Sequence, residues 1–335
     1  MQDVLRQSGI AKNGDQGGVI PEITIRHFLD LLNPTYKVKG KSGKVQEKQA
    51  EPYEVGKLID MIISRKSRKL TKVIDKNGTI RQVLANLFKT FGKEGERIFR
   101  KIVSAGNYQK NGAAVGKTEL ALAMFFSDCK LPDKHGDIQL AVKDGSRAIE
   151  IKGSAAVITN RITRSNRFEI GTSWKQYGSH IKNISKDIVS EINLSEVNPT
   201  DKKKMGEALQ RRLALIDDKL SKEHKEVPEE SWTALKFAML FGALFRAYAQ
   251  ITTNKKGDPN GGFDEMWIFN TEDDLGNNKE SALLDSRLVK IQANESTFWY
   301  NDGIRILNSL KNQGIDVQFQ SAHDSGQGGF KAIFA

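Results

Sequence analysis

The alternation of polar and apolar residues between Gly136 and Gly153 is the most informative hydrophobic pattern in this sequence. The segment GDIQLAV alternates after its glycine, and RAIEIKG alternates again after the intervening KDGS. Alternation with a period of two is typical of half-buried β-strands, and Asp-Gly between two such runs indicates a two-residue turn. The pattern therefore predicts a β-hairpin with Asp144 and Gly145 at the centre of its turn.

This turn predicts which residues face one another across the hairpin. Asp137 then lies opposite Lys152. Gln139 lies opposite Glu150. Directly opposed residues, and residues two apart on one strand, share a face of the sheet. We therefore expect Asp137, Glu150 and Lys152 on one face at the open end of the hairpin, while the isoleucines that flank Glu150 point into a core.

The remaining periodicity predicts an α/β protein. Residues 1–20 are polar and glycine-rich, which is typical of a flexible arm, and residues 37–51 predict a lysine-rich loop. Apolar spacing near 3.6 predicts helices over residues 23–32, 53–64, 80–90, 94–104, 117–129, 231–252 and 298–313, with a charged helical insertion over 181–229. Strands are predicted over residues 263–270, 288–292, 315–320 and 330–334, with a Gly/Ser loop before the last of them. We expect a basic helical module over residues 1–105, followed by a domain over 106–335 with a C-terminal α/β extension from about residue 285.

Composition narrows the class of partner. The 335-residue chain has a formal net charge of +11, which favours a polyanion such as nucleic acid over a membrane. A single cysteine, Cys129, excludes a disulfide framework and a cysteine zinc site, and it fits a reducing, cytoplasmic compartment. The apolar stretch 231–252 is close to a membrane span in length, but Lys236 and Arg246 interrupt it, so we expect a buried helix.

The hairpin residues have the chemistry of a hydrolytic metal site. Two neighbouring carboxylates, here Asp137 and Glu150, bind a hard divalent cation through oxygen, and Mg²⁺ is the usual ion where phosphate is another ligand. A lysine beside them, Lys152, supplies hydrogen-bond donors for an attacking water or a phosphate. Glu119 falls in the first turn of the helix predicted before the hairpin, from which it can add another carboxylate.

The segment GAAVGKT resembles a phosphate-binding P-loop only superficially. Three residues separate Gly112 from Gly116, whereas the P-loop needs four between its first glycine and the Gly-Lys pair. We therefore expect these glycines to turn the backbone into the following helix rather than to bind a nucleotide.

Two groups of basic residues are candidates for contact with the nucleic-acid backbone. The first is a run between two predicted helices, and the second recurs every third residue just after Lys152: Arg65, Lys66, Arg68, Lys69 and Lys72, then Arg161, Arg164 and Arg167. A solvated charged face is the alternative for both groups.

Taken in order, Glu119, Gly136-Asp137 and Glu150-Ile151-Lys152 resemble the motif of the PD-(D/E)XK, or restriction-endonuclease-like, nuclease superfamily. The segments GKTELALA, GDIQL and IEIKGS are similar to nuclease-like proteins of large tailed phages. The resemblance implies a core of helix, three-stranded antiparallel meander, helix and strand. It implies that Asp137, Glu150 and Glu119 are metal ligands and that Lys152 is the catalytic lysine.

The resemblance further implies a phage-encoded DNA endonuclease that uses Mg²⁺, with Mn²⁺ as a substitute. The host cytoplasm and the virion are both compatible locations, and a homodimer stays open. Asp133 in the literal Pro-Asp pair is an alternative to Asp137 as the metal ligand, although it precedes the predicted strand. The alternative function is a non-catalytic nucleic-acid-binding or virion structural protein built on the same fold.

Overall fold

The structure, a computed structural model, describes two compact units of a mixed α/β protein. Unit 1 comprises residues 1–151 and 269–288, and unit 2 comprises residues 152–268 and 289–335. The residues described are 35–39, 45–49, 69–71, 108–110, 113–115, 119, 122–123, 125–131, 136–153, 155–164, 168–192, 202–250, 252–253, 259–260, 262–269, 288–292 and 299–334. The arm over residues 1–20, the four helices predicted between residues 23 and 104, and the boundary predicted at residue 105 lie outside them.

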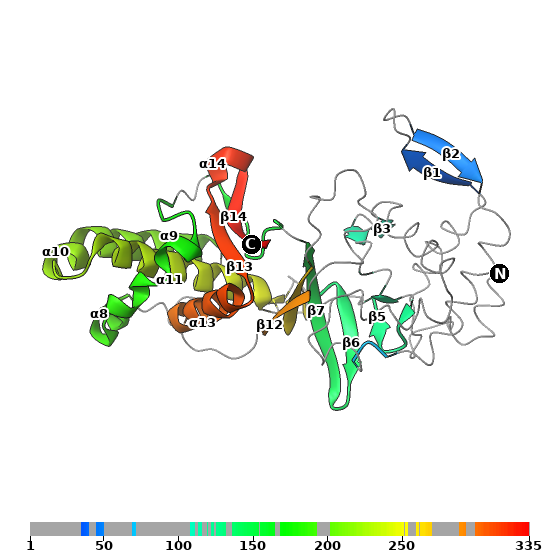
Figure 1. Cartoon of the computed structure of the whole chain (residues 1–335), viewed down its shortest axis with the longest axis horizontal. Helices are drawn as coiled ribbons and strands as arrows, with labels where there is room; N and C mark the ends of the chain where they lie inside the picture. The colour runs from blue at the N-terminus through cyan, green and yellow to red at the C-terminus, as the bar shows by residue number, and fades with distance from the viewer. Residues whose placement is uncertain are drawn as a thin grey trace. The chain divides into compact units, whose positions relative to one another are not determined.

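Unit 1 contains a hairpin that the sequence did not predict. Strands β1 (Thr35–Lys39) and β2 (Val45–Gln49) pair antiparallel, with Lys37 opposite Glu47 (Figure 1). The prediction of a lysine-rich loop over residues 37–51 was therefore wrong. An antiparallel ladder is held by backbone hydrogen bonds, which polar and charged residues supply as well as apolar ones.

A second short hairpin occupies part of the segment that resembles a P-loop. Strands β3 (Tyr108–Lys110) and β4 (Ala113–Val115) pair antiparallel, with Tyr108 opposite Val115. Residues 113–115 are extended, so this part of the glycine-containing segment is a strand rather than a turn that leads into the helix.

A three-stranded meander in unit 1 contains the predicted hairpin and one further strand. Strands β5 (Cys129–Lys130), β6 (Ile138–Val142) and β7 (Gly145–Gly153) form an antiparallel meander. The chain is helical at residues 119, 122, 123 and 125, but the predicted helix does not continue to residue 129. Cys129 pairs with Leu140 in the sheet instead. The sequence pattern did not show this, because a short apolar run is compatible with either the end of a helix or a strand.

The meander buries one face. Ile138 and Ile149 are fully buried and directly opposed, and Leu140 lies beside them. Asp128, just before β5, is 8 % exposed; its carboxylate oxygens accept hydrogen bonds from the backbone amides of Leu70 and Thr71, at 2.7 and 2.9 Å. Those two bonds attach a distant segment of unit 1 to the start of the meander.

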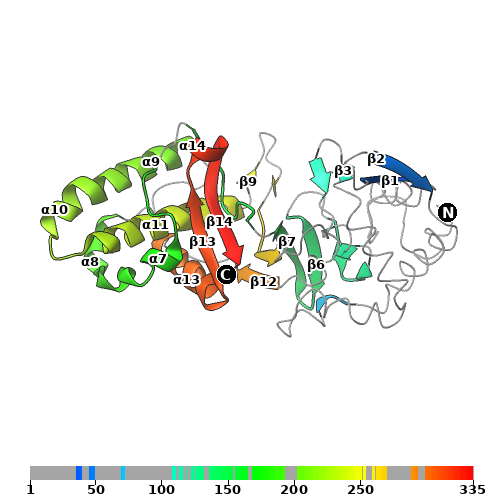
Figure 2. The same ribbon diagram turned by 45° about the horizontal axis from the view of Figure 1, so that its top comes forward.

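Unit 2 is built around helix α11 (Glu229–Ala249), which confirms the buried helix predicted from the most apolar segment. The helix packs on a sheet with the order β13 (Ile315–Gln320), β14 (Gln327–Phe334) and β8 (Ile162–Thr163) (Figures 1 and 2). The ring of Phe330 on β14 meets Phe237 and Phe241 of α11 edge-on, at 5.0 and 5.3 Å between centroids. These aromatic pairs join the helix to the sheet.

The described residues of the charged segment 181–229 are mostly helical, as predicted. They form η2 (His180–Asn183), α8 (Lys186–Glu191), α9 (Lys202–Ala214), the π-helical turn η3 (Leu215–Leu220) and α10 (Ser221–Glu223), and a short helix that was not predicted, α7 (Trp174–Tyr177), precedes them. Asp217 in η3 accepts a 2.6 Å bond from the ammonium group of Lys236. This pair accommodates one of the two charges that interrupt the apolar sequence of α11.

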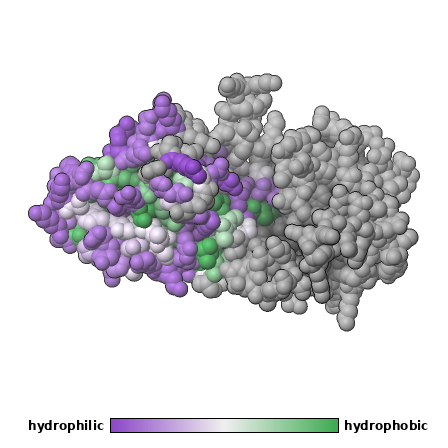
Figure 3. Space-filling view, turned by 90° about the horizontal axis from the view of Figure 1, so that it is seen from above, coloured by the Kyte–Doolittle hydropathy of each residue, from purple (hydrophilic) through white to green (hydrophobic). Residues whose placement is uncertain are grey.

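The predicted C-terminal elements occur in the predicted order, and two short strands that were not predicted, β9 (Thr252–Thr253) and β10 (Pro259–Asn260), precede them. These strands are followed by β11 (Glu265–Phe269), β12 (Leu288–Gln292) and α13 (Trp299–Asn312). The predicted Gly/Ser loop is shorter than expected, because it contains α14 (Ala322–Ser325) and the first residues of β14. Within the described part of the chain, no helix has the length and apolar character needed to cross a membrane. On the face of unit 2 seen in Figure 3, hydrophilic residues predominate and the apolar patches are small and separate.

Gly303 lets helix α13 approach α11 closely. A Cβ atom at this position would lie 2.2 Å from the carbonyl oxygen of Ala238 and 3.2 Å from the backbone nitrogen of Gly242. No side chain fits between two backbones at that distance, so the contact between the helices requires glycine here.

Gly303→Ala is therefore expected to destabilise unit 2 by about 2 kcal/mol or more, although alanine is the better helix former. All four tryptophans belong to unit 2, so denaturation followed by tryptophan fluorescence measures this effect directly. Asn301→Ala, at an exposed site in the same helix, is the control and should change stability by less than about 0.5 kcal/mol. A Gly303→Ala protein as stable as wild type would contradict the close packing.

Candidate functional site

The hairpin of β6 and β7 positions the candidate residues, in a register that differs from the predicted one. Val142 pairs with Gly145, so Lys143 and Asp144 form the two-residue turn. Gly145 opens β7 with φ of 135°, a conformation that favours glycine, instead of occupying the turn centre. The predicted register was wrong by two residues.

A shift of two residues leaves every side chain on its predicted face, because the strand repeat is two. Ile138 pairs with Ile149, and both are buried in the core as expected. Ile151, which was also expected in the core, is only half-buried. The change therefore alters which polar residues are neighbours across the hairpin, not which face they occupy.

Asp137 is attached to β7 by two hydrogen bonds that flank Glu150. Its backbone amide donates to the carbonyl of Ile149 at 2.7 Å, and its carboxylate Oδ2 accepts from the amide of Ile151 at 2.7 Å. Asp137 was predicted to lie opposite Lys152. In the structure its hydrogen bonds to β7 lie on either side of Glu150 instead. Asp137 and Glu150 are therefore at the same level of the hairpin, at its open end.

Gly136 makes this attachment possible. Its φ is 63°, in the left-handed region, and a Cβ atom there would lie 2.8 Å from the carbonyl oxygen and 2.9 Å from the nitrogen of Ile149. The backbone thus passes so close to β7 that only glycine fits. The structure thus explains why glycine precedes aspartate here. Gly136 allows the backbone to approach β7, and Asp137 then forms hydrogen bonds with β7.

The four predicted site residues share an intermediate environment. Asp137, Glu150 and Lys152 are half-buried on or beside β7, and Glu119 is half-buried on helical backbone earlier in unit 1. Glu150 and Lys152 are two residues apart on one strand and share a face. The bonds that attach Asp137 to β7 do not involve Glu119, and Asp133 lies outside the described residues.

Lys152 has an aromatic neighbour that the sequence did not indicate. Its ammonium nitrogen lies 5.3 Å from the ring centroid of Tyr248, near the end of α11. A tyrosine in an apolar helix is usually a core residue, so no sequence signal distinguished this one.

The basic candidates are described in part. Lys69, Arg161 and Arg164 are exposed, and the guanidinium group of Arg161 donates a 2.9 Å bond to the side-chain oxygen of Gln327 at the start of β14. Residues 161–164 adopt an extended segment with a turn, not a helix. The other basic candidates lie outside the described residues: Arg65, Lys66, Arg68, Lys72 and Arg167.

The possible metal donors at the hairpin are carboxylate oxygens. Among the residues that the structure describes, no three His, Cys, Asp or Glu side chains are grouped to hold an ion. The two acidic residues at this end of the hairpin, Asp137 and Glu150, supply oxygen atoms only. Mg²⁺ commonly takes one or two carboxylates and completes its octahedron with water and substrate phosphate.

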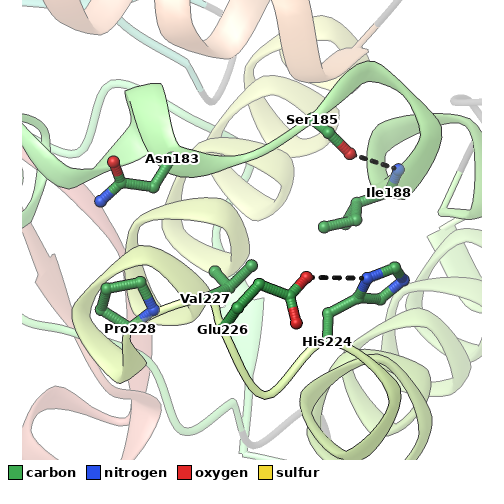
Figure 4. A pocket seen from close by; sticks show the side chains of 7 residues that line it. All are labelled: Asn183, Ser185, Ile188, His224, Glu226, Val227 and Pro228. Carbon is green, nitrogen blue, oxygen red and sulfur yellow. Dashed lines mark hydrogen bonds and ion pairs between the residues drawn. The ribbon is translucent and has the colours of Figure 1, made fainter.

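A separate pocket lies in unit 2, away from this hairpin in the sequence (Figure 4). His224 and Glu226 line it, with Nδ1 and Oε1 3.3 Å apart, and Ser185 caps α8 at its edge by accepting a bond from the amide of Ile188. Its other lining residues are Asn183, Val227 and Pro228. It combines one exposed His–Glu pair with apolar side chains, and it has no second carboxylate for metal chemistry.

The chain matches no protein-family model, no curated protein and no solved structure. Inference about function therefore depends on the residues and their geometry.

The attachment of Asp137 predicts a measurable effect of Gly136→Ala. The added Cβ would push the backbone away from Ile149 and weaken the bond between the Ile151 amide and the Asp137 carboxylate, so exchange of that amide should accelerate about tenfold or more. Hydrogen exchange resolved by residue measures this rate, and Asp137→Ala should give the same acceleration.

Gly145→Ala is the matched control, since Gly145 also has positive φ but a Cβ there meets nothing within 4 Å. It should leave exchange at Ile151 much closer to that of the wild type. Equal acceleration in the Gly136→Ala and Gly145→Ala proteins would show that backbone strain, and not the close approach, governs the junction.

Proposed function

We propose that this chain is a metal-dependent DNA endonuclease with a restriction-endonuclease-like core. The observation that carries the proposal is the pair of hydrogen bonds between Asp137 and the residues on either side of Glu150, one donated to Ile149 and one accepted from Ile151. Asp137 is thereby at the level of Glu150 at the end of the hairpin, and Lys152 follows two residues later on the same strand. A binding module needs a positive surface, but it has no use for a carboxylate pair next to a lysine.

Asp137 and Glu150 would hold the ion, with Glu119 as a third candidate. A bound Mg²⁺ supplies a water of lowered pKa and positive charge for the phosphoryl oxygens. Lys152 donates hydrogen bonds to the attacking water or to a non-bridging oxygen, which stabilises charge that grows in the transition state. The bond from Ile151 holds the Asp137 carboxylate in one orientation before substrate arrives.

DNA is the proposed substrate because of charge. The net charge of +11 favours a polyanion, and the described arginines Arg161 and Arg164 are exposed close after Lys152 in the sequence. Their guanidinium groups are suited to phosphate oxygens. The proposed enzyme recognises the phosphate backbone through these charges.

The decisive experiment is a cleavage assay on supercoiled plasmid, linear duplex and single-stranded DNA with Mg²⁺ or Mn²⁺. Asp137→Asn, Glu150→Gln and Lys152→Ala should each reduce the rate about 100-fold or more, because each removes charge or a donor used in the transition state. Asp144→Asn and Lys143→Ala are matched controls at the exposed turn of the same hairpin and should cleave like wild type.

Three outcomes are informative. Cleavage that stops with EDTA and in the three variants supports the proposal. A Lys152→Ala protein that cleaves as fast as wild type contradicts the role given to the lysine. DNA binding without cleavage of any substrate, and without a calorimetric Mg²⁺ signal that Asp137→Asn abolishes, favours the non-catalytic nucleic-acid-binding or virion protein.

The backbone contacts predict a change in salt dependence. The double variant Arg161→Ala/Arg164→Ala should bind DNA more weakly, and the slope of log K against log salt should fall by about two, one for each lost phosphate contact. Fluorescence anisotropy with a labelled duplex at several salt concentrations measures both. The control is the double variant Lys222→Ala/Lys225→Ala, which removes the same charge from exposed positions in and after α10. It should lower the slope of log K against log salt by less than the arginine variant does. An unchanged slope in the arginine variant would exclude these two contacts.

A further inference from the structure

The side chain of Lys152 lies against an aromatic face. Its Nζ is 5.3 Å from the centroid of the Tyr248 ring, within the range of a cation–π contact. Both residues are half-buried, so the contact is partly shielded from water. Shielding strengthens the attraction between an ammonium group and the negative face of a ring.

The Tyr248 ring is itself fixed by aromatic neighbours. Its centroid is 5.4 Å from that of Phe263 at an interplanar angle of 76°, and Phe263 meets Phe245 edge-on at 6.0 Å. Phe263 is 5 % exposed, and its backbone amide donates to the carbonyl of Ala249 at 3.0 Å. The ring is therefore a rigid platform built from the end of α11 and the segment before β11.

A rigid platform matters more for lysine than for most side chains. Lysine has four rotatable bonds and loses considerable rotamer freedom whenever its ammonium group must occupy one place. A ring that attracts the charged group in advance restricts those rotamers before substrate binds. Half-burial of an ammonium group is costly without such a partner, and the ring face offsets part of that cost.

We infer that Tyr248 is a positioning residue for Lys152: its ring face, not its hydroxyl group, holds the ammonium group in the orientation used by the active site. The inference rests on the proposed function for its catalytic consequence. The contact itself is testable whether or not the chain cleaves DNA, so the two can fail separately.

The contact can be tested by NMR of protein labelled with ¹³C at the lysine ε-carbon, with the Lys152 signal assigned from Lys152→Arg. The ring current should displace the Lys152 ε-proton signal upfield. Tyr248→Phe should keep this displacement and Tyr248→Leu should lose it, while Tyr177→Leu, at another half-buried tyrosine of unit 2, should leave it in place. Absence of the displacement in wild type, or its survival in Tyr248→Leu, overturns the contact.

The catalytic consequence is tested with kcat in the cleavage assay. Tyr248→Leu should lower kcat about tenfold, and Tyr248→Phe should restore most of that loss, as expected from the strength of a partly shielded cation–π contact. Pentafluorophenylalanine at position 248 keeps the ring's shape but reverses its quadrupole, so it should behave like the leucine variant. Because it preserves packing, it also covers the case in which the leucine variant does not fold.

The outcomes separate the two proposals. A displaced Lys152 signal with no cleavage by wild type overturns the nuclease and supports the contact. Cleavage that is equal for phenylalanine and pentafluorophenylalanine at position 248 overturns the positioning role, whatever the leucine variant does, because only the electrostatics of the ring differ between them.

Discussion

The hydrogen bond from the Ile151 amide to the Asp137 carboxylate is the constraint on which the candidate site depends. The β6 ladder begins at Ile138, so Asp137 lies just outside it and is attached by its own bonds to β7. A carboxylate that accepts a hydrogen bond from a backbone amide has a defined orientation. The Asp137 carboxylate is held in this way by the amide of Ile151, the residue that follows Glu150. The bond is possible only because Gly136 allows the chain to run against β7.

Two aspartates of unit 1 illustrate how environment separates structural from candidate functional carboxylates. Asp128 is 8 % exposed, and its two oxygens accept from the amides of Leu70 and Thr71, so its carboxylate acts as an internal anchor. Asp137 is half-buried at the open end of a hairpin, where its bonds to Ile149 and Ile151 lie on either side of Glu150. A local irregularity of this kind, with a glycine at positive φ beside an acidic strand end, is typical of functional sites.

In unit 2 the same helix provides the core and the platform for the lysine. Phe237 and Phe241 of α11 close on Phe330 of the sheet, and one end of that helix carries Tyr248 to Lys152. The rigidity of the ring therefore derives from the burial of α11 as a whole. Tyr248, which the sequence pattern assigns to the core, thus contacts Lys152 at the edge of that core.

The sequence determined the two strands of the central hairpin, the faces of its residues and the buried helix α11, because periods of two and 3.6 follow from local backbone geometry. Tertiary structure decided the turn register, since Gly145 pairs with Val142 only when both strands are in place. It also decided the β1–β2 pairing, which the lysine-rich sequence does not indicate, and the contact of Lys152 with Tyr248. Contacts between residues far apart in the chain depend on packing, which no local pattern encodes.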